Sequence, residues 1–239
     1  MGCCSSNSTE VREPKRFYHK MSEEEKEKIK KETEEQDKDI IEEESIDEDP
    51  RLCEIFDLEE LKKKLPISKT SEDRLKRLEL WNKLNETDND YVSFKKFSLY
   101  LLAYLKLPNV DKNRQPIKSA FVAAKNKYLK YGLKIDDNII VWMEFRIFLV
   151  YLRQYYEYWV MFNQVDDSNE NQISLKEFKK AVPLMGNWGV KIKDSEKEFK
   201  SISKNNETIS FEDFCSYAIT KSLDLEEADD DLEYEKQKL

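Results

Sequence analysis

Apolar side chains recur at intervals of three and four residues on both sides of a polar segment in the second half of the chain. The run QYYEYWVMFNQV ends at Val165, and the run KEFKKAV begins at Lys176. This spacing is typical of amphipathic helices. Pro183 follows the second run and is expected to help end its helix. The pattern therefore predicts a helix–loop–helix unit whose loop spans residues 166–177.

The loop carries oxygen-bearing residues at the spacing of an EF-hand calcium loop. Such a loop offers oxygen ligands at positions 1, 3, 5, 7 and 9 and a bidentate carboxylate at position 12, with glycine at position 6 for a sharp turn. We place the isolated apolar residue Ile173 at position 8. The ligand positions then hold Asp166, Ser168, Glu170, Gln172 through its backbone carbonyl, Ser174 and Glu177. We predict a Ca²⁺ site here; the alternative is an acidic helix–turn–helix that binds no ion.

The turn position of this loop holds Asn171 instead of glycine. Asparagine is the non-glycine residue that most readily adopts the left-handed backbone conformation, so the turn is strained but accessible. If the strain costs about 1 kcal/mol, calcium affinity falls several-fold and is not abolished.

Three further segments repeat the outline with altered ligands. NETDNDYVSFKKF has Lys96 at position 12, where an ammonium would repel the ion. LKIDDNIIVWMEF keeps Glu144 at position 12 but has Leu133 and Ile135 where oxygen is required. SKNNETISFEDF ends its loop at Asp213, is one residue short and lacks the glycine. We expect the first two to bind no ion and the last to be empty or very weak. All three remain useful as scaffolding, because EF-hands pair through a loop strand and share an apolar core.

These units predict an all-α fold of two EF-hand pairs, four hands with mostly degenerate loops, behind a charged N-terminal extension. The predicted divisions are an acylated anchor over residues 1–20, a charged spacer or helical extension over 21–70, EF-hand pairs over 71–153 and 154–223, and an acidic tail over 224–239. The aromatic-rich stretch 141–162 is apolar on more than one side. We interpret it chiefly as a core shared by the two pairs; a groove for a partner helix or an acyl chain is the alternative for part of it.

Composition narrows the function classes. The chain is 38% charged with a net charge of −9, and the excess acid lies in the flanking segments. Residues 21–50 have almost nothing to bury, which predicts a fraying helix that ends before Pro50, or a disordered spacer. One histidine, His19, and four glycines leave no histidine triad, histidine zinc cluster or glycine-rich phosphate loop. We therefore expect no enzyme and no nucleic-acid partner. Cys53 and Cys215 are expected to be small buried hydrophobic residues in a reducing compartment.

The N-terminal sequence MGCCSS fits a lipidation pattern. Gly2 would become the myristoylated N-terminus with Ser6 as the small hydroxyl residue, and Cys3 and Cys4 are candidates for palmitate. One myristoyl chain gives reversible membrane binding, so stable attachment needs a second signal. No apolar run reaches the roughly 18 residues of a membrane helix, and no secretory signal is recognised. We predict a lipid anchor; the alternative is a disordered start that matches by chance.

From about residue 71 to 223 the sequence resembles the calflagins, the acylated EF-hand proteins of the flagellar membrane. The resemblance is carried by MEFRIFLVYL, by VMFNQVDDSNENQISLKEFKKAVPLMGNWGVKI and by ISFEDF, and the MGC-type start agrees with it. It implies calcium binding in the third and fourth hands, carried in the third by Asp166, Ser168, Glu170, Gln172 and Glu177. In the fourth hand this sequence departs from the family, because Ser203 replaces the opening aspartate and one residue is lost.

The expected function is that of a membrane-anchored calcium sensor on the cytoplasmic face of the flagellar, ciliary or plasma membrane, with exchange into the cytosol as an option. Calcium at the third hand would expose or reshape an apolar groove for a protein target. Two alternatives remain open. One is a calcium-independent acylated adaptor in which every hand is scaffold, and the other is a calcium-regulatory subunit of an enzyme or channel.

Overall fold

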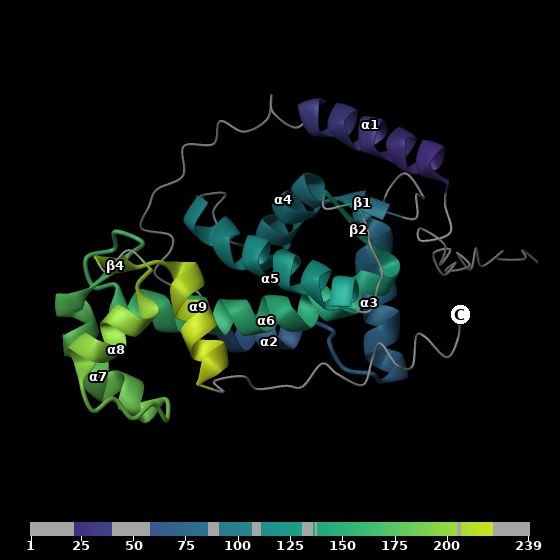
Figure 1. Ribbon diagram of the computed structural model, residues 1–239. Coiled ribbons are helices and arrows are strands. Elements are labelled where there is room, and N and C mark those ends of the chain that lie inside the picture. The colour runs from purple at the N-terminus through teal and green to yellow at the C-terminus, as the bar shows by residue number, and fades with distance from the viewer. Residues whose placement is uncertain are drawn as a thin grey trace, which may run out of the picture.

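The described part of the chain, in a computed structural model, comprises residues 22–39, 58–85, 91–106, 111–130, 136, 138–204 and 207–221. Its helices are α1 (Glu23–Asp39), α2 (Leu58–Lys64), α3 (Ser71–Leu84), α4 (Phe94–Leu105), α5 (Asp111–Lys130), α6 (Trp142–Val165), α7 (Leu175–Asn187), α8 (Ser195–Ile202) and α9 (Phe211–Thr220). Its strands are β1 (Tyr91–Ser93), β2 (Ile139–Val141), β3 (Ile173–Ser174) and β4 (Thr208–Ile209). The chain is mostly helical (Figure 1), which confirms the predicted all-α class.

The short strands join the loops two by two. β1 runs antiparallel to β2, with Val92 opposite Ile140, and β3 runs antiparallel to β4, with Ile173 opposite Ile209. All four of these side chains are buried. The apolar residue near the middle of each loop thus meets its counterpart, as expected for EF-hands that pair through their loop strands.

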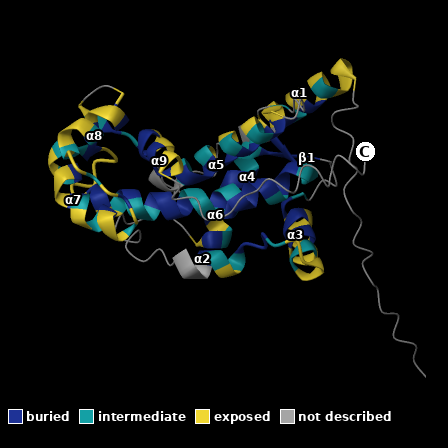
Figure 2. Cartoon of the chain, turned by 60° about the horizontal axis from the view of Figure 1, so that its bottom comes forward, coloured by how far each residue is buried: buried dark blue, intermediate teal, exposed yellow. Residues whose placement is uncertain are grey.

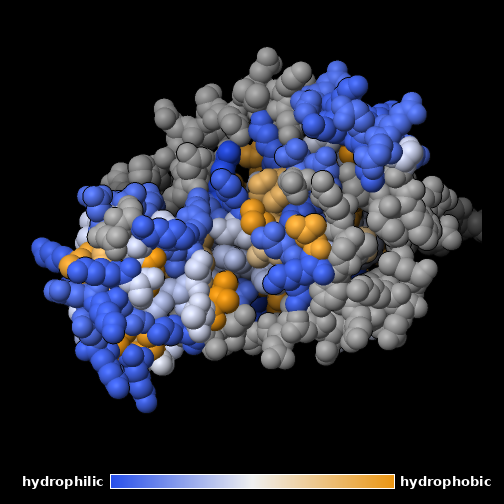
Figure 3. All heavy atoms as spheres, viewed as in Figure 1, coloured by the Kyte–Doolittle hydropathy of each residue, from blue (hydrophilic) through white to orange (hydrophobic). Residues whose placement is uncertain are grey.

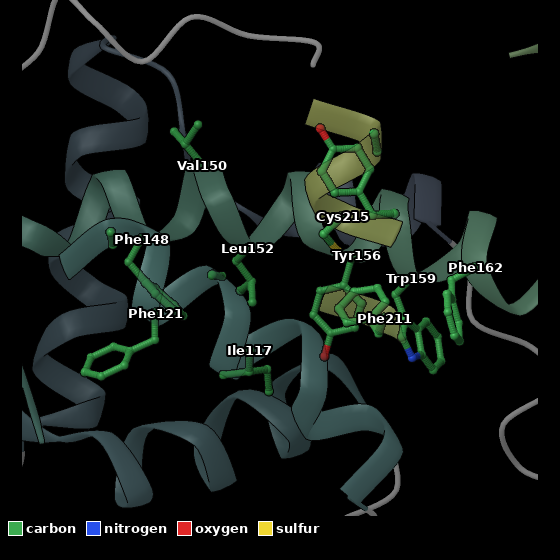
Figure 4. Packing of buried hydrophobic residues seen from close by; sticks show 14 of the residues in the cluster. Ile117, Phe121, Phe148, Val150, Leu152, Tyr156, Trp159, Phe162, Phe211 and Cys215 are labelled. Carbon is green, nitrogen blue, oxygen red and sulfur yellow. The ribbon is translucent and has the colours of Figure 1, made fainter. Parts of the chain in front are cut away.

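α6 is the central helix and belongs to two helix–strand–helix units at once, since it follows β2 and ends where the third loop begins. It is buried on several sides, and one apolar cluster extends around it from α2 to α9. Phe148 packs edge-on against Phe97 of α4, with 4.9 Å between ring centroids. Phe162 packs edge-on against Phe211 of α9 at 5.6 Å (Figure 4). The interpretation of the stretch 141–162 as a shared core is confirmed.

α2 and the residues after it close one side of α6. Leu61 and Leu65 are buried in the main core, and Lys62 forms an ion pair with Glu157 of α6 at 2.9 Å. Burial of a leucine side chain stabilises a fold by about 1.5–3 kcal/mol. This part of the segment 21–70 is therefore a structural component of the core.

α1 lies beside the β1–β2 pair (Figure 1). Ile29 is buried against Ile139 and Val141 of β2, while most of the helix is exposed (Figure 2). The expectation that residues 21–50 have almost nothing to bury is therefore wrong at this turn of the helix. Thr33, one turn further on, is also buried, and the hydroxyl of Tyr91 donates to Glu32 Oε2 at 2.8 Å, so a few contacts dock this charged helix on a small apolar patch. The predicted helix end before Pro50 lies outside the described residues.

Pro183 lies inside α7, which continues to Asn187, so the prediction that it helps end this helix is wrong. Proline in a helix interior costs about 3 kcal/mol through a lost hydrogen bond and a clash. Met185 lies two residues further on and is 1% exposed, and the helix must continue to place it in the core. Its burial, worth about 1.5–3 kcal/mol, offsets much of that cost.

The surface is largely hydrophilic over α1 and over the α7–α8 end, with apolar atoms reaching the surface in the middle of the face shown in Figure 3. The large apolar side chains that are mainly exposed in the described ranges are Leu75, Val122, Leu129 and Ile219. None of the described helices is long and apolar enough to span a bilayer.

Cys215 of α9 lies in the core beside α6 (Figure 4). It is buried, and this burial raises the pKa of its thiol. It therefore behaves as a small hydrophobic residue, as predicted. Cys53 lies outside the described residues.

Candidate calcium site

The third loop connects α6 to α7, and its backbone makes a sharp turn. α6 ends at Val165, β3 contributes Ile173 to the strand pair, and α7 begins after its N-cap residue Ser174. Asn169 and Asn171 have φ angles of 62° and 59°. The left-handed conformation that the ligand register requires at position 6 is therefore present at Asn171.

Asp166 organises the first half of the loop. Its side chain is buried, and its Oδ1 accepts a hydrogen bond from the N–H of Glu170 at 3.1 Å. Its Oδ2 accepts a hydrogen bond from the N–H of Asn171 at 2.8 Å. The hydroxyl of Ser168 donates to Oδ1 at 3.4 Å. The carboxylate at position 1 thus folds the following five residues around itself.

Glu177 closes the loop from the first turn of α7. Its Oε1 accepts the N–H of Ser168 at 2.8 Å, and its Oε2 accepts the N–H of Ser174 at 2.8 Å and the hydroxyl of Ser174 at 2.7 Å. Partial burial alone would raise the pKa of this carboxyl, but the hydrogen bonds from Ser174 and Ser168 outweigh it and lower the pKa to about 2. The group is therefore ionised at neutral pH, as a calcium ligand must be.

Ser168 lies between the two carboxylates, because its hydroxyl donates to Asp166 and its N–H donates to Glu177. Residues from opposite ends of the loop are thereby brought to one point. The carboxylate, hydroxyl and carbonyl oxygens of this loop form the kind of donor set that fits a calcium ion. Gln172 would contribute its backbone carbonyl, whereas the side chain of Glu170 is exposed and would have to turn inward.

The carboxylates of the site are few. Within the described ranges, no three acidic, histidine or cysteine side chains converge as a ready-made metal cluster. The third loop instead offers two positioned carboxylates, Asp166 and Glu177, supplemented by neutral oxygens. We expect moderate calcium affinity from such a site, because the affinity of an EF-hand loop depends on the number of its charged ligands and on its rigidity.

The fourth loop carries an ion pair at its last ligand position. Lys204 Nζ lies 2.7 Å from Asp213 Oδ1, and the hydroxyl of Ser210 donates to Asp213 Oδ2 at 2.8 Å. An ammonium at this point competes with any metal ion for the carboxylate. The contact supports the expectation that this loop is empty or very weak.

The second loop carries a more deeply buried ion pair. Glu144, at position 12, is 1% exposed, and Lys125 Nζ of α5 lies 2.8 Å from its Oε2. Aligning the loops does not identify this lysine, because it lies on a different helix and no local pattern points to it. Lys204, by contrast, directly follows Ser203 inside the fourth loop and can be recognised from the sequence. Residues 131–135, which include the apolar ligand positions of the second loop, lie outside the described residues.

Asn171→Gly is expected to tighten calcium binding by about twofold to fivefold, because glycine adopts the left-handed conformation without steric cost and no ligand changes. Isothermal titration calorimetry measures the change. Asn171→Ala is the matched control and should weaken binding, since alanine tolerates this conformation less well than asparagine. Equal affinities for both variants would show that position 171 is not the turn of the calcium loop.

The sequence is similar to that of known calcium-binding proteins. Residues 61–152, from α2 into α6, match the model of the FCaBP EF-hand domain family. The chain is 29% identical over 168 residues to the flagellar calcium-binding protein of Trypanosoma cruzi. The aligned region covers 70% of this chain and 80% of that protein. These matches support the calflagin family for this chain. The chain is also 29% identical over 161 residues to two flagellar calcium-binding proteins of Trypanosoma brucei brucei, covering 74% of TB-24 and 40% of TB-44A.

The similarity to the calflagins indicates the broad class of the protein. The family is one of EF-hand calcium-binding proteins, which are not enzymes. The match begins at Leu61, the buried leucine of α2, so it includes the second half of this helix and continues through the first two helix–strand–helix units as far as residue 152 of α6. The third loop lies beyond the end of this match.

Proposed function

We propose that this protein is a calflagin and a calcium sensor of the flagellum that responds through its third EF-hand. The observation that carries the proposal is the meeting of Asp166 and Glu177 at Ser168, in a loop that offers only oxygen ligands. The relatives named above support both calcium and the flagellum, because both words stand in their names. The ligands would be Asp166, Ser168, Glu170, Gln172 through its carbonyl, and Glu177.

The two main ligands belong to the ends of two different helices. Asp166 caps the C-terminus of α6, and Glu177 lies in the first turn of α7. A bound calcium ion would supply positive charge shared by these oxygens. Drawing Glu177 closer to Asp166 would pull α7 relative to α6. A change in the angle between two such helices is the means by which EF-hand sensors expose apolar surface.

A pocket next to the loop, with aromatic and polar walls, would change with this movement. It has a volume of about 250 Å³ and is lined by the aromatic side chains of Trp159, Phe162 and Phe211, which Figure 4 shows. Asn171 and Gln172 of the loop, and the polar residues Gln115, Ser210 and Glu212, complete the lining. Because two lining residues belong to the calcium loop, a shift of the loop reshapes the pocket. An amphipathic helix of a partner protein, which inserts apolar side chains into such grooves, is the expected kind of target.

Membrane attachment would come from the N-terminus. Gly2, Cys3 and Cys4 lie outside the described residues, so this part of the proposal rests on the MGCCSS pattern. A buried acyl chain contributes about 0.8 kcal/mol per methylene, and a single myristoyl chain gives only marginal binding. Palmitate on either cysteine would retain the protein on the cytoplasmic face of the membrane.

Gly2→Ala is expected to move the protein from the membrane fraction to the soluble fraction, because palmitoylation depends on a first visit to the membrane. The double variant Cys3→Ser/Cys4→Ser should stay partly bound, with a partition that differs between calcium and chelator. Adding Glu177→Gln to this double variant should remove the calcium effect. Cell fractionation measures all three. Full membrane binding of Gly2→Ala would contradict the proposed lipid anchor. If calcium does not change the partition of the double variant, the anchor is retained but its proposed coupling to the third loop is contradicted.

A calcium-independent membrane adaptor is the second candidate function. It is favoured by the ion pairs of Glu144 with Lys125 and of Asp213 with Lys204. In two of the loops, the carboxylate at the last ligand position is thus already neutralised by a lysine of the same chain. An adaptor would keep the lipid anchor and bind no calcium on titration. A regulatory subunit of an enzyme or channel would be recognised by a partner that is captured only with calcium present.

A further inference from the structure

The second loop keeps a carboxylate at position 12 although its sequence has lost other ligands. Glu144 lies in the first turn of α6, and its side chain is 2% exposed. Leu133 and Ile135 stand at positions where a calcium loop requires oxygen. A carboxylate buried to this degree is unfavourable unless a positive charge is placed beside it. The charge that balances Glu144 must therefore come from a source other than a calcium ion held by this loop.

The balancing charge is the ammonium of Lys125. Its Nζ lies 2.8 Å from Glu144 Oε2, and its side chain is only 11% exposed. The same Nζ lies 5.2 Å from the centroid of the Phe121 ring, a favourable position for a cation over an aromatic face. One turn further along α5, the hydroxyl of Tyr128 donates to the carbonyl of Met143 at the start of α6. The ion pair thus belongs to a set of contacts that joins α5 to the first turn of α6.

Glu144 and Glu177 cap their helices in the same way. Oε2 of Glu144 accepts the N–H of Val141 at 3.3 Å, and Oε2 of Glu177 accepts the N–H of Ser174 at 2.8 Å. In both cases the donor lies three residues earlier, at the N-cap of the helix. The two glutamates differ in a second contact, which is the Lys125 ammonium for Glu144 and the N–H of Ser168 for Glu177. A fixed cation therefore stands in the second hand at the carboxylate that faces a calcium ion in a working hand.

We propose that the Lys125 ammonium is the resident cation of the second EF-hand and takes the structural place of calcium there. It ties α5 to α6 next to the β1–β2 pair and holds these elements in one arrangement at any calcium concentration. The first two helix–strand–helix units then form a rigid base that does not respond to calcium. This inference does not depend on calcium binding at the third loop, because it concerns different residues at the opposite end of α6.

Amide hydrogen exchange of the full-length protein at Ile139–Val141 tests the proposal, with calcium and with chelator. Lys125→Met keeps the length and most of the apolar stem but removes the charge. It is expected to speed exchange on the order of a hundredfold, because it leaves a buried carboxylate without its partner. Lys118→Met, at an exposed position of the same helix, is the matched control and should leave exchange unchanged. In the wild-type protein, exchange at these amides should be equal with calcium and with chelator.

The double variant Lys125→Met/Glu144→Gln separates charge from packing. A neutral amide does not require a cation, so the double variant should recover most of the protection that Lys125→Met loses. Three results would overturn the proposal: Lys125→Met behaving like Lys118→Met, a double variant as unprotected as Lys125→Met, or a calcium-dependent exchange rate at these amides in the wild type. If Lys125→Met does not fold, the proposal still requires the double variant to fold and to exchange within a few-fold of the wild type.

Discussion

Glu177→Gln is expected to weaken calcium binding by at least about a hundredfold, a loss of roughly 2.7 kcal/mol. The carboxylate of Glu177 accepts hydrogen bonds on both oxygens and is ionised at neutral pH. Glutamine has one side-chain oxygen and no charge, so it can neither chelate the ion with two oxygens nor balance its charge. On isothermal titration, the wild-type protein should bind about one calcium ion per chain, with a dissociation constant on the order of 10⁻⁶ to 10⁻⁴ M.

Asp213→Asn is the matched control for this experiment. It removes the corresponding charge from the fourth loop, where Lys204 already lies against the carboxylate. The stoichiometry and affinity of calcium binding should therefore change little. Two equivalent sites in the wild type, or calcium binding that survives Glu177→Gln and is lost in Asp213→Asn, would show that the ion is held by a different loop.

The architecture around the third loop could be predicted from sequence because it is set by local residues. Placing Ile173 at position 8 puts an apolar residue in the strand pair, and the structure buries it opposite Ile209. The same register puts Asn171 at the sharp turn, where its φ angle is 59°. Whether the loop's oxygens bind calcium is a separate matter that the titration decides. Gly2, Cys3 and Cys4 remain a prediction from the sequence alone.

Features that depend on contacts between distant segments could not be predicted in this way. Lys125 reaches Glu144 because α5 and α6 pack together, and no sequence motif links the two residues. Ile29 looks isolated within a charged helix until the patch on β2 is present to receive it. Pro183 would end an isolated helix, but burial of Met185 keeps α7 intact beyond it. In each case tertiary packing sets the outcome, and for Pro183 it outweighs the local preference.

Ile209→Ala is expected to lower the free energy of unfolding by about 2–4 kcal/mol, although it lies in a loop that has lost ligands. The side chain of Ile209 is fully buried and lies opposite Ile173 in the β3–β4 pair. Truncation leaves a cavity at the point where the third loop is supported. Calcium affinity should also fall several-fold without loss of any ligand. Urea denaturation and isothermal titration measure the two effects.

Ile219→Ala removes the same side chain from an exposed position of α9, 44% accessible, and should change stability by less than about 0.5 kcal/mol. Comparing it with Ile209→Ala distinguishes the effect of losing a contact in the β3–β4 pair from the effect of losing any apolar side chain. If Ile209→Ala lowers stability but leaves calcium affinity unchanged, the third loop holds its shape without its neighbour, and the fourth loop serves the fold alone. If stability and affinity fall together, the degenerate loop is retained because β4 holds Ile173, and through it the ligands on either side, in the geometry that the ion requires.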